Sequence, residues 1–135
     1  MNILQISFHT APMNSLGVND GGGLNVYVEA ISKDLAKDNT VHVITGEEAK
    51  NINNRNLKLV SFNLFSNQVN IEEKKKYLDE FLDKTFQYID ENNIDVVHAH
   101  YWLSGLVALK IKKRNKIPFI FTSHSLGVFV QENNL

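Results

Sequence analysis

The sequence predicts an α/β fold, a doubly wound parallel sheet with helices on both of its faces. Short apolar runs of strand length alternate along the chain with longer segments whose apolar residues recur at helical spacing. Such alternation is typical of a parallel sheet whose strands are joined by helices. The 135 residues suit one domain that buries a sizeable core, and a single domain over residues 1–135 is the expected organisation.

The first third of the chain contains a strand, a glycine-rich loop and a helix. Residues 3–8 form an apolar run that is too short for a helix and indicates a buried strand. Residues 10–23 contain a proline and four glycines, a composition typical of a loop. From Leu24 the apolar positions follow helical spacing, and the predicted helix ends near Asp38.

Four further strands and two further helices are predicted downstream. The strands are expected at residues 41–45, 57–62, 94–100 and 117–122, and the helices at residues 71–92 and from Trp102 or Leu103 to about residue 116. The charged run 72–76, which begins the first of these helices, is expected to form a solvated face. Right-handed crossovers and short connections favour the Rossmann-like strand order 3-2-1-4-5.

The composition excludes several classes of protein. The chain has 14 Lys and Arg against 15 Asp and Glu, so it lacks the basic surface of a nucleic-acid-binding protein. The absence of cysteine excludes a disulfide scaffold, a thiol nucleophile and cysteine-bound zinc. No apolar run approaches the roughly 20 residues of a membrane-spanning helix, and residues 1–4 lack the basic region of a signal peptide. We therefore expect a cytoplasmic protein without a nucleic-acid partner or an integral membrane segment.

Histidines follow three of the predicted strands. His9 comes directly after the first strand, His98 and His100 end the fourth, and His124 follows the fifth. In an open α/β sheet, ligands bind at the carboxyl edge, where the strand order reverses. The glycines at 21–23 lead into the first helix at the same edge, which would aim backbone N–H groups at an anion.

Each of these features has an alternative explanation. The glycines are compatible with a strained turn, and they match no dinucleotide fingerprint because Val26 stands where the third glycine is required. Glu47 ends the second strand as a ribose-binding acid would, so a nicotinamide site stays open as a weaker alternative. His98 and His100 share one side of a strand, as metal ligands would, but Asp20 is the only loop carboxylate nearby. A buried, hydrogen-bonded structural role is favoured for one of the two histidines.

Three motifs in this order resemble the N-terminal half of family 4 glycosyltransferases of the GT-B fold. They are DGGGLNVYV at residues 20–28, DVVHAHYWLSG at residues 95–105 and FTSHSLG at residues 121–127. The sequence is similar to the sucrose-phosphate synthase and sucrose synthase group and to the mycothiol-pathway transferase that glycosylates inositol phosphate. The resemblance implies a two-domain enzyme in which this chain is the acceptor-side domain, without its C-terminal donor-nucleotide domain.

The resemblance also implies an activity and a set of site residues. Such enzymes transfer a sugar from a nucleotide-diphosphate sugar, for example a UDP- or GDP-linked one, to a small hydroxyl acceptor with retention of configuration. They use no metal and no cofactor besides this co-substrate. Gly22 and Gly23 would contact the donor diphosphate and sugar, and His124 would be the catalytic residue that hydrogen-bonds the transferred sugar. The residues implied for acceptor binding are His9, Asn25, Tyr101 and Ser125.

Two departures from the family pattern concern the acceptor. Relatives that take phosphorylated acceptors carry one lysine where this chain has Ile71, with Lys74 a turn away, and another where it has Val130. These differences favour a neutral acceptor or another way of holding a phosphate. Two other functions stay open: a stand-alone module that binds a nucleotide, sugar or anion at the glycine loop, and a metal-dependent hydrolase that uses the histidines.

Overall fold

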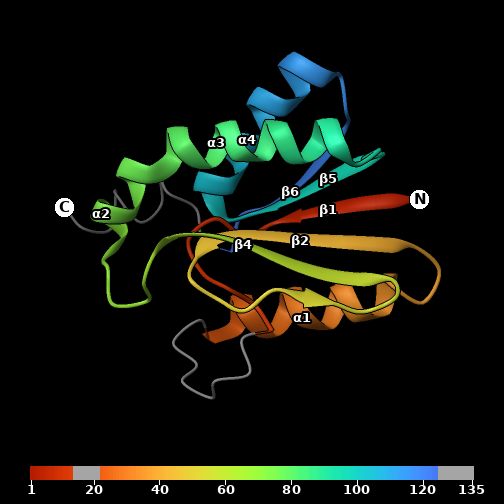
Figure 1. Cartoon of the computed structure of the whole chain (residues 1–135), viewed down its shortest axis with the longest axis horizontal. Helices are drawn as coiled ribbons and strands as arrows, with labels where there is room; N and C mark the ends of the chain where they lie inside the picture. The colour runs from red at the N-terminus through yellow and green to blue at the C-terminus, as the bar shows by residue number, and fades with distance from the viewer. Residues whose placement is uncertain (14–21, 125–135) are drawn as a thin grey trace.

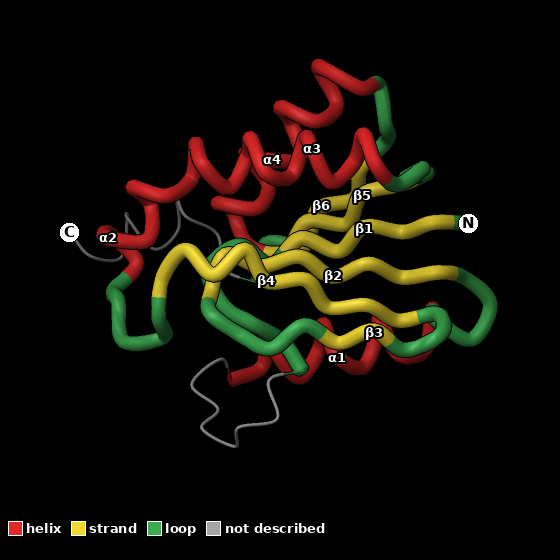
Figure 2. Tube along the Cα trace, viewed as in Figure 1, coloured by secondary structure: helices red, strands yellow, loops and turns green. Residues whose placement is uncertain are grey.

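The computed structural model describes residues 1–13 and 22–124 of the chain (Figures 1 and 2). The strands are β1 (Asn2–Ile6), β2 (Thr40–Glu47), β3 (Ile52–Asn53), β4 (Leu57–Phe65), β5 (Val96–His100) and β6 (Phe119–Thr122). The helices are α1 (Gly22–Leu35), α2 (Ile71–Lys74), the 3-10 turn η1 (Lys75–Tyr77), α3 (Leu78–Glu91) and α4 (Tyr101–Asn115). Within these ranges, no helix has the length and apolar character needed to cross a membrane.

The strands form one sheet in the order β3-β4-β2-β1-β5-β6. All neighbouring strands are parallel except β3, which pairs antiparallel with β4. Without β3, this is the predicted order 3-2-1-4-5, which is therefore confirmed. The two residues of β3 are too few to show any periodicity, and a turn brings them back onto β4, where Asn54 N donates to the Leu57 carbonyl over 3.0 Å.

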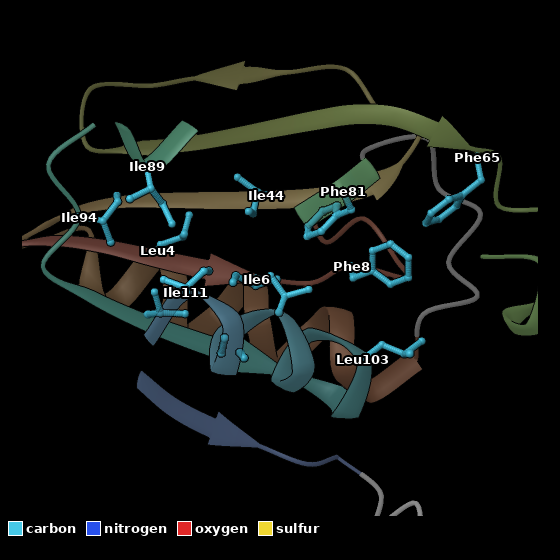
Figure 3. Packing of buried hydrophobic residues seen from close by; sticks show 14 residues of the cluster. Leu4, Ile6, Phe8, Ile44, Phe65, Phe81, Ile89, Ile94, Leu103 and Ile111 are labelled. Atoms are coloured by element: carbon cyan, nitrogen blue, oxygen red, sulfur yellow. The ribbon is translucent and has the colours of Figure 1, made fainter. Parts of the chain in front are cut away.

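Helices cover both faces of the sheet, as expected for a doubly wound fold. Figure 1 shows α3 and α4 on one face and α1 on the other. On the α3 and α4 face, Leu4 and Ile6 of β1 are fully buried in the larger core cluster (Figure 3). The Phe8 ring meets the Phe65 and Phe81 rings edge-on, with ring centres 5.4 and 5.0 Å apart.

The α1 face combines a smaller apolar cluster with polar groups near the carboxyl ends of the strands. Its buried apolar members are Val28, Val41, Val43, Leu57 and Leu59. Because side chains alternate along a strand, Gln5 of β1 lies on the face opposite Leu4 and Ile6. The β1–β5 register places Gln5 beside His98, which brings polar side chains together on this face.

The segment predicted as one helix over residues 71–92 is divided into three pieces. The Asn70 side chain caps α2 by accepting a hydrogen bond from Glu73 N over 2.9 Å, as an N-cap residue does. The expectation that the whole charged run is solvated was wrong, because Lys74 is only 8% exposed and its ammonium group turns inward. The neighbouring charges behave as expected, since they form the exposed pairs Glu72–Lys75 and Glu73–Lys76.

Gly46 of β2 provides a test of the packing. A Cβ atom on Gly46 would lie 2.8 Å from the Phe65 ring and 3.2 Å from the Phe8 carbonyl oxygen, whereas one on Gly23 would meet nothing within 4 Å. We expect Gly46→Ala to lower the free energy of unfolding by roughly 1–3 kcal/mol through overpacking. Gly23→Ala, the matched control, should leave it unchanged or raise it by less than about 1 kcal/mol. Urea denaturation measures both, and wild-type stability of Gly46→Ala would contradict the packing described here.

Candidate functional site

The loop after β1 is held in place from several elements at the carboxyl edge of the sheet. Phe8 N donates to Ser104 Oγ of α4 over 3.0 Å, and Ala11 N donates to Glu47 Oε2 at the end of β2 over 2.7 Å. Each bond crosses between segments far apart in sequence, and both are buried. The backbone of residues 7–11 therefore forms a fixed platform from which the chain continues toward α1.

A buried ion pair supports this platform. Lys74 Nζ donates to the His9 carbonyl over 2.6 Å and lies 3.6 Å from Glu47 Oε1, and both side chains are largely buried. Burying one charge alone would be costly, so the two groups compensate each other. The Glu47 carboxylate is thus engaged by Ala11 and Lys74 and is only 6% exposed, which contradicts its assignment to a ribose.

The histidines of β5 and the loop after β6 form a contiguous cluster. His100 is fully buried, and its ring nitrogens lie 2.5 Å from Gln5 Oε1 and 3.1 Å from His124 Nε2. His98 packs its ring 4.0 Å from that of His100 and hydrogen-bonds Thr122 Oγ1 over 2.8 Å. The predicted structural role for one of the two β5 histidines thus holds for both, since each is buried and hydrogen-bonded.

Tyr27 connects α1 to this cluster. Its ring meets the rings of His100 and His124 edge-on, with centres 5.8 and 5.5 Å apart. Tyr27 belongs to the first sequence motif, His100 to the second and His124 to the third. The fold therefore brings all three motifs into contact at one edge of the sheet, as the sequence predicted.

Two predicted acceptor-binding residues present unpaired polar atoms beside this cluster. His9 stacks on Tyr101 with ring centres 4.5 Å apart, and Asn25 Nδ2 donates to Thr10 Oγ1 over 2.9 Å. His9 Nδ1 and Asn25 Oδ1 are buried and have no hydrogen-bond partner within residues 1–13 and 22–124. Ser125, the fourth predicted acceptor contact, lies outside the described residues, as do Asp20 and Val130.

The glycines at the site differ from those that serve packing. A Cβ atom on Gly105 would lie 2.9 Å from the Phe121 ring, so that position has no room for a side chain. Gly23, in the first turn of α1, faces open space, so packing among the described residues does not require a glycine there. Gly22 begins the same helix. The missing side chain at Gly23 therefore leaves space that no atom of residues 1–13 and 22–124 fills.

Two candidate site residues adopt backbone conformations that side-chain-bearing residues rarely occupy. Tyr101 has a φ of 73° where β5 turns into α4, and His124 has a φ of 57° just after β6. Such conformations cost free energy and are concentrated at functional sites. The helix α4 begins at Tyr101, earlier than the predicted Trp102 or Leu103.

A metal centre receives no support from this geometry. Within the described ranges, no three His, Cys, Asp or Glu side chains are grouped to hold a metal ion. Both ring nitrogens of His100 and the Nε2 atom of His98 are already hydrogen-bonded to protein groups.

A separate recess of about 280 Å³ between α4 and β6 is lined by the apolar side chains of Trp102, Leu106, Leu109, Phe119 and Phe121, together with Gly105.

Burial favours the neutral form of the site histidines in the folded protein. Burial, together with the Lys74 ammonium group and His124, lowers the pKa of His9 to about 4. Burial, together with the nearby His98 and His124, lowers the pKa of His100 to about 3. A neutral ring donates at one nitrogen and accepts at the other, which is what the contacts of His100 require.

These shifts make stability depend on pH. In the unfolded chain His9 titrates near 6.5, so between pH 6.5 and 4 the unfolded state binds more protons than the folded state. We expect the stabilisation to be complete above pH 6.5 and to fall by on the order of 3 kcal/mol at pH 4 from His9 alone. Urea denaturation across this range should show a smaller loss for His9→Gln, and an equally steep loss in that variant would contradict the account.

Comparisons with known proteins identify related sequences. A family model described as Glycosyltransferase Family 4 matches residues 21–134. The D-inositol 3-phosphate glycosyltransferase of Frankia alni is 34% identical over 133 residues, which cover 88% of this chain and 32% of the relative. That of Corynebacterium jeikeium is 30% identical over 144 residues, which cover 100% of this chain and 34% of the relative. The chain thus spans about a third of the length of these relatives.

The fold has a counterpart among solved structures. Sucrose-phosphate synthase from Thermosynechococcus elongatus matches with a TM-score of 0.84 at 24% sequence identity, covering 97% of this chain and 35% of that one. This likeness shows the fold, whereas the family model and the relatives at 30% identity or more show the family. The chain therefore belongs to glycosyltransferase family 4 and has the Rossmann-like fold of one half of a GT-B enzyme.

Proposed function

We propose that this chain is the acceptor-side domain of a cytoplasmic transferase. The enzyme moves a sugar from a nucleotide-diphosphate sugar to a small hydroxyl acceptor, with retention of anomeric configuration. The observation that carries the proposal is the open space at Gly23, one helical turn before Tyr27, whose ring contacts His124. Ligand groups at this position would meet the start of α1 and the histidine cluster together.

The chemistry of the leaving group suits this position. Departure of a nucleoside diphosphate builds negative charge, and free backbone N–H groups at the start of a helix stabilise such charge. Gly22 and Gly23 occupy the first turn of α1, and the absence of a side chain at Gly23 permits close approach of the diphosphate and the transferred sugar. His124 is exposed and next to this opening, where it would contact the sugar.

The acceptor side is built from neutral groups. His9 Nδ1 and Asn25 Oδ1 have no hydrogen-bond partner within residues 1–13 and 22–124, and hydroxyl groups of the acceptor would bond to them, beside the Tyr101 ring that packs on His9. Lys74 is the cation nearest to His9, but its charge is compensated by Glu47 and its ammonium group binds the His9 carbonyl. These contacts favour a polyol or sugar acceptor over one held by its phosphate.

We propose that a second domain completes the donor site. The relatives are about three times as long as the matched region, and a GT-B enzyme places its reaction between two domains. The direct test is an assay of the full-length polypeptide that contains this chain, with UDP- and GDP-sugars as donors and inositol and inositol 3-phosphate as acceptors. Sugar transfer, faster to inositol, is the expected result. Tight nucleotide-sugar binding by the 135 residues alone, without transfer by the full-length protein, would instead support a stand-alone binding module.

Gly23→Val tests the donor site in that assay. A valine would occupy the open space at the start of α1 and exclude the diphosphate or the sugar, so we expect a loss of turnover of roughly 100-fold or more. Because a Cβ atom at this position would meet nothing within 4 Å among the described residues, the thermal unfolding midpoint should stay close to that of the wild type. Gly23→Ala, the smaller control, should lose less activity. Wild-type turnover in Gly23→Val would rule out this position as the donor site.

His124→Ala tests the assignment of the catalytic residue. If His124 contacts the transferred sugar mainly in the transition state, kcat should fall by roughly 100-fold while the KM for the acceptor changes little. His42→Gln is a suitable histidine control, because His42 bonds Tyr88 of α3 on the opposite face of the sheet and should leave kcat unchanged. A raised acceptor KM with unchanged kcat in His124→Ala would make it an acceptor-binding residue only.

A further inference from the structure

We propose that Gln5 and His100 are positioning residues that hold His124 in its Nε2–H tautomer, with Nδ1 left as a hydrogen-bond acceptor for a ligand hydroxyl. Gln5, His100 and His124 come from β1, β5 and the loop after β6, and together they form a continuous chain of hydrogen bonds. The proposal rests on the proposed function only in taking that hydroxyl to belong to a sugar.

The first bond of the chain fixes the tautomer of His100. The Gln5 Oε1 atom lies 2.5 Å from His100 Nε2, and an amide oxygen can only accept a hydrogen bond. His100 Nε2 must therefore carry the hydrogen. Burial keeps this ring neutral by lowering its pKa to about 3, so its other nitrogen, Nδ1, has a lone pair and no hydrogen.

The second bond passes this constraint on to His124. Since His100 Nδ1 can only accept, the hydrogen in the 3.1 Å contact must come from His124 Nε2. A neutral His124 then has a bare Nδ1. Burial lowers the pKa of His124 as well, which favours the neutral form. The burial is partial and the residue as a whole is exposed, so Nδ1 can accept a hydrogen bond from a hydroxyl group of a ligand.

The surrounding residues keep the hydrogen bonds between Gln5, His100 and His124 in one arrangement. Gln5 and His100 are both fully buried, so neither exchanges its partner for water. The titratable groups that face His100 are His98, with its ring centre 4.0 Å away, Tyr27 from α1 and His124 itself. His98 is bonded separately to Thr122, so it does not compete for the nitrogens of His100.

This arrangement explains why a glutamine occurs between the apolar residues Leu4 and Ile6 of β1. A buried amide costs stability unless it makes hydrogen bonds, and the Nε2 atom of Gln5 has no partner in the part of the chain that the structure describes. A hydrophobic residue would pack at this position without that cost. Gln5 instead orients His124 at the ligand site through two successive hydrogen bonds, Gln5–His100 and His100–His124.

The test is nitrogen-15 NMR of the histidine rings at pH 7, on the chain labelled at histidine. In the wild type, His124 and His100 should both show a hydrogen on Nε2 and a bare Nδ1, with widely separated nitrogen shifts. In Gln5→Met, which removes the acceptor at similar volume, the two nitrogen shifts of His124 should move toward each other as both tautomers become populated. Thr122→Val, the control, removes the hydrogen bond of His98 and should leave the His124 shifts in place.

Several results would overturn the proposal. A hydrogen on Nδ1 of His124 in the wild type would mean that the Gln5 amide is reversed and that every bond of the chain runs the other way. This result needs no variant, so the proposal stays testable even if Gln5→Met fails to fold. Unchanged His124 shifts in a folded Gln5→Met would equally exclude a positioning role.

Kinetics separate this proposal from the proposed function. In the full-length enzyme, Gln5→Met should lower kcat roughly 10-fold, the effect of losing one oriented hydrogen bond, and change the KM of the acceptor less. If His124 shows the expected tautomer but the full-length enzyme transfers no sugar, the positioning role holds and the proposed transferase function is refuted. Sugar transfer at a wild-type rate by Gln5→Met, with its tautomers mixed, would refute the positioning role and keep the transferase.

Discussion

The position of β1 at the centre of the sheet is the constraint on which the rest of this structure depends. β1 pairs in parallel with β2 on one side and β5 on the other, and its side chains are buried on both faces. The strand order reverses at β1, so the carboxyl ends of β1 and of its neighbours β2 and β5 meet at the position where ligands bind in such sheets. The loop after β1 is then bonded to Ser104 and Glu47, and its His9 carbonyl binds Lys74.

The two faces of β1 have different roles: one packs into the apolar core, and the other contributes a polar side chain to the candidate site. Leu4 and Ile6 face the apolar core under α3 and α4 (Figure 3), whereas Gln5 faces the opposite side of the sheet and bonds His100 of β5. Because side chains alternate along β1, the same strand is fixed in the apolar core on one face and contributes a polar side chain to the site on the other. As a result, Gln5, His98 and His100 lie on strands whose opposite face is closely packed, which limits their movement.

Much of the fold could be predicted from the sequence, because strand-length apolar runs and helical spacing are local patterns. The edge that carries the histidines followed from the strand order alone. Lys74 was missed since it lies in a charged run, although it stands four residues before Leu78 and seven before Phe81, on the line of the apolar stripe. Gln5 was missed for a different reason: its contact with His100 depends on the β1–β5 register, which no local pattern reveals.

We propose that the start of α1 and His124, just after β6, form one sugar-transfer site. Hydrogen–deuterium exchange of the full-length protein, with and without a nucleotide-diphosphate sugar, tests it most directly. The account predicts slower exchange of backbone amides at residues 22–27 and around residue 124 when the sugar nucleotide is present. Unchanged exchange in both segments, with slowing confined to other parts of this domain such as the recess between α4 and β6, would contradict it.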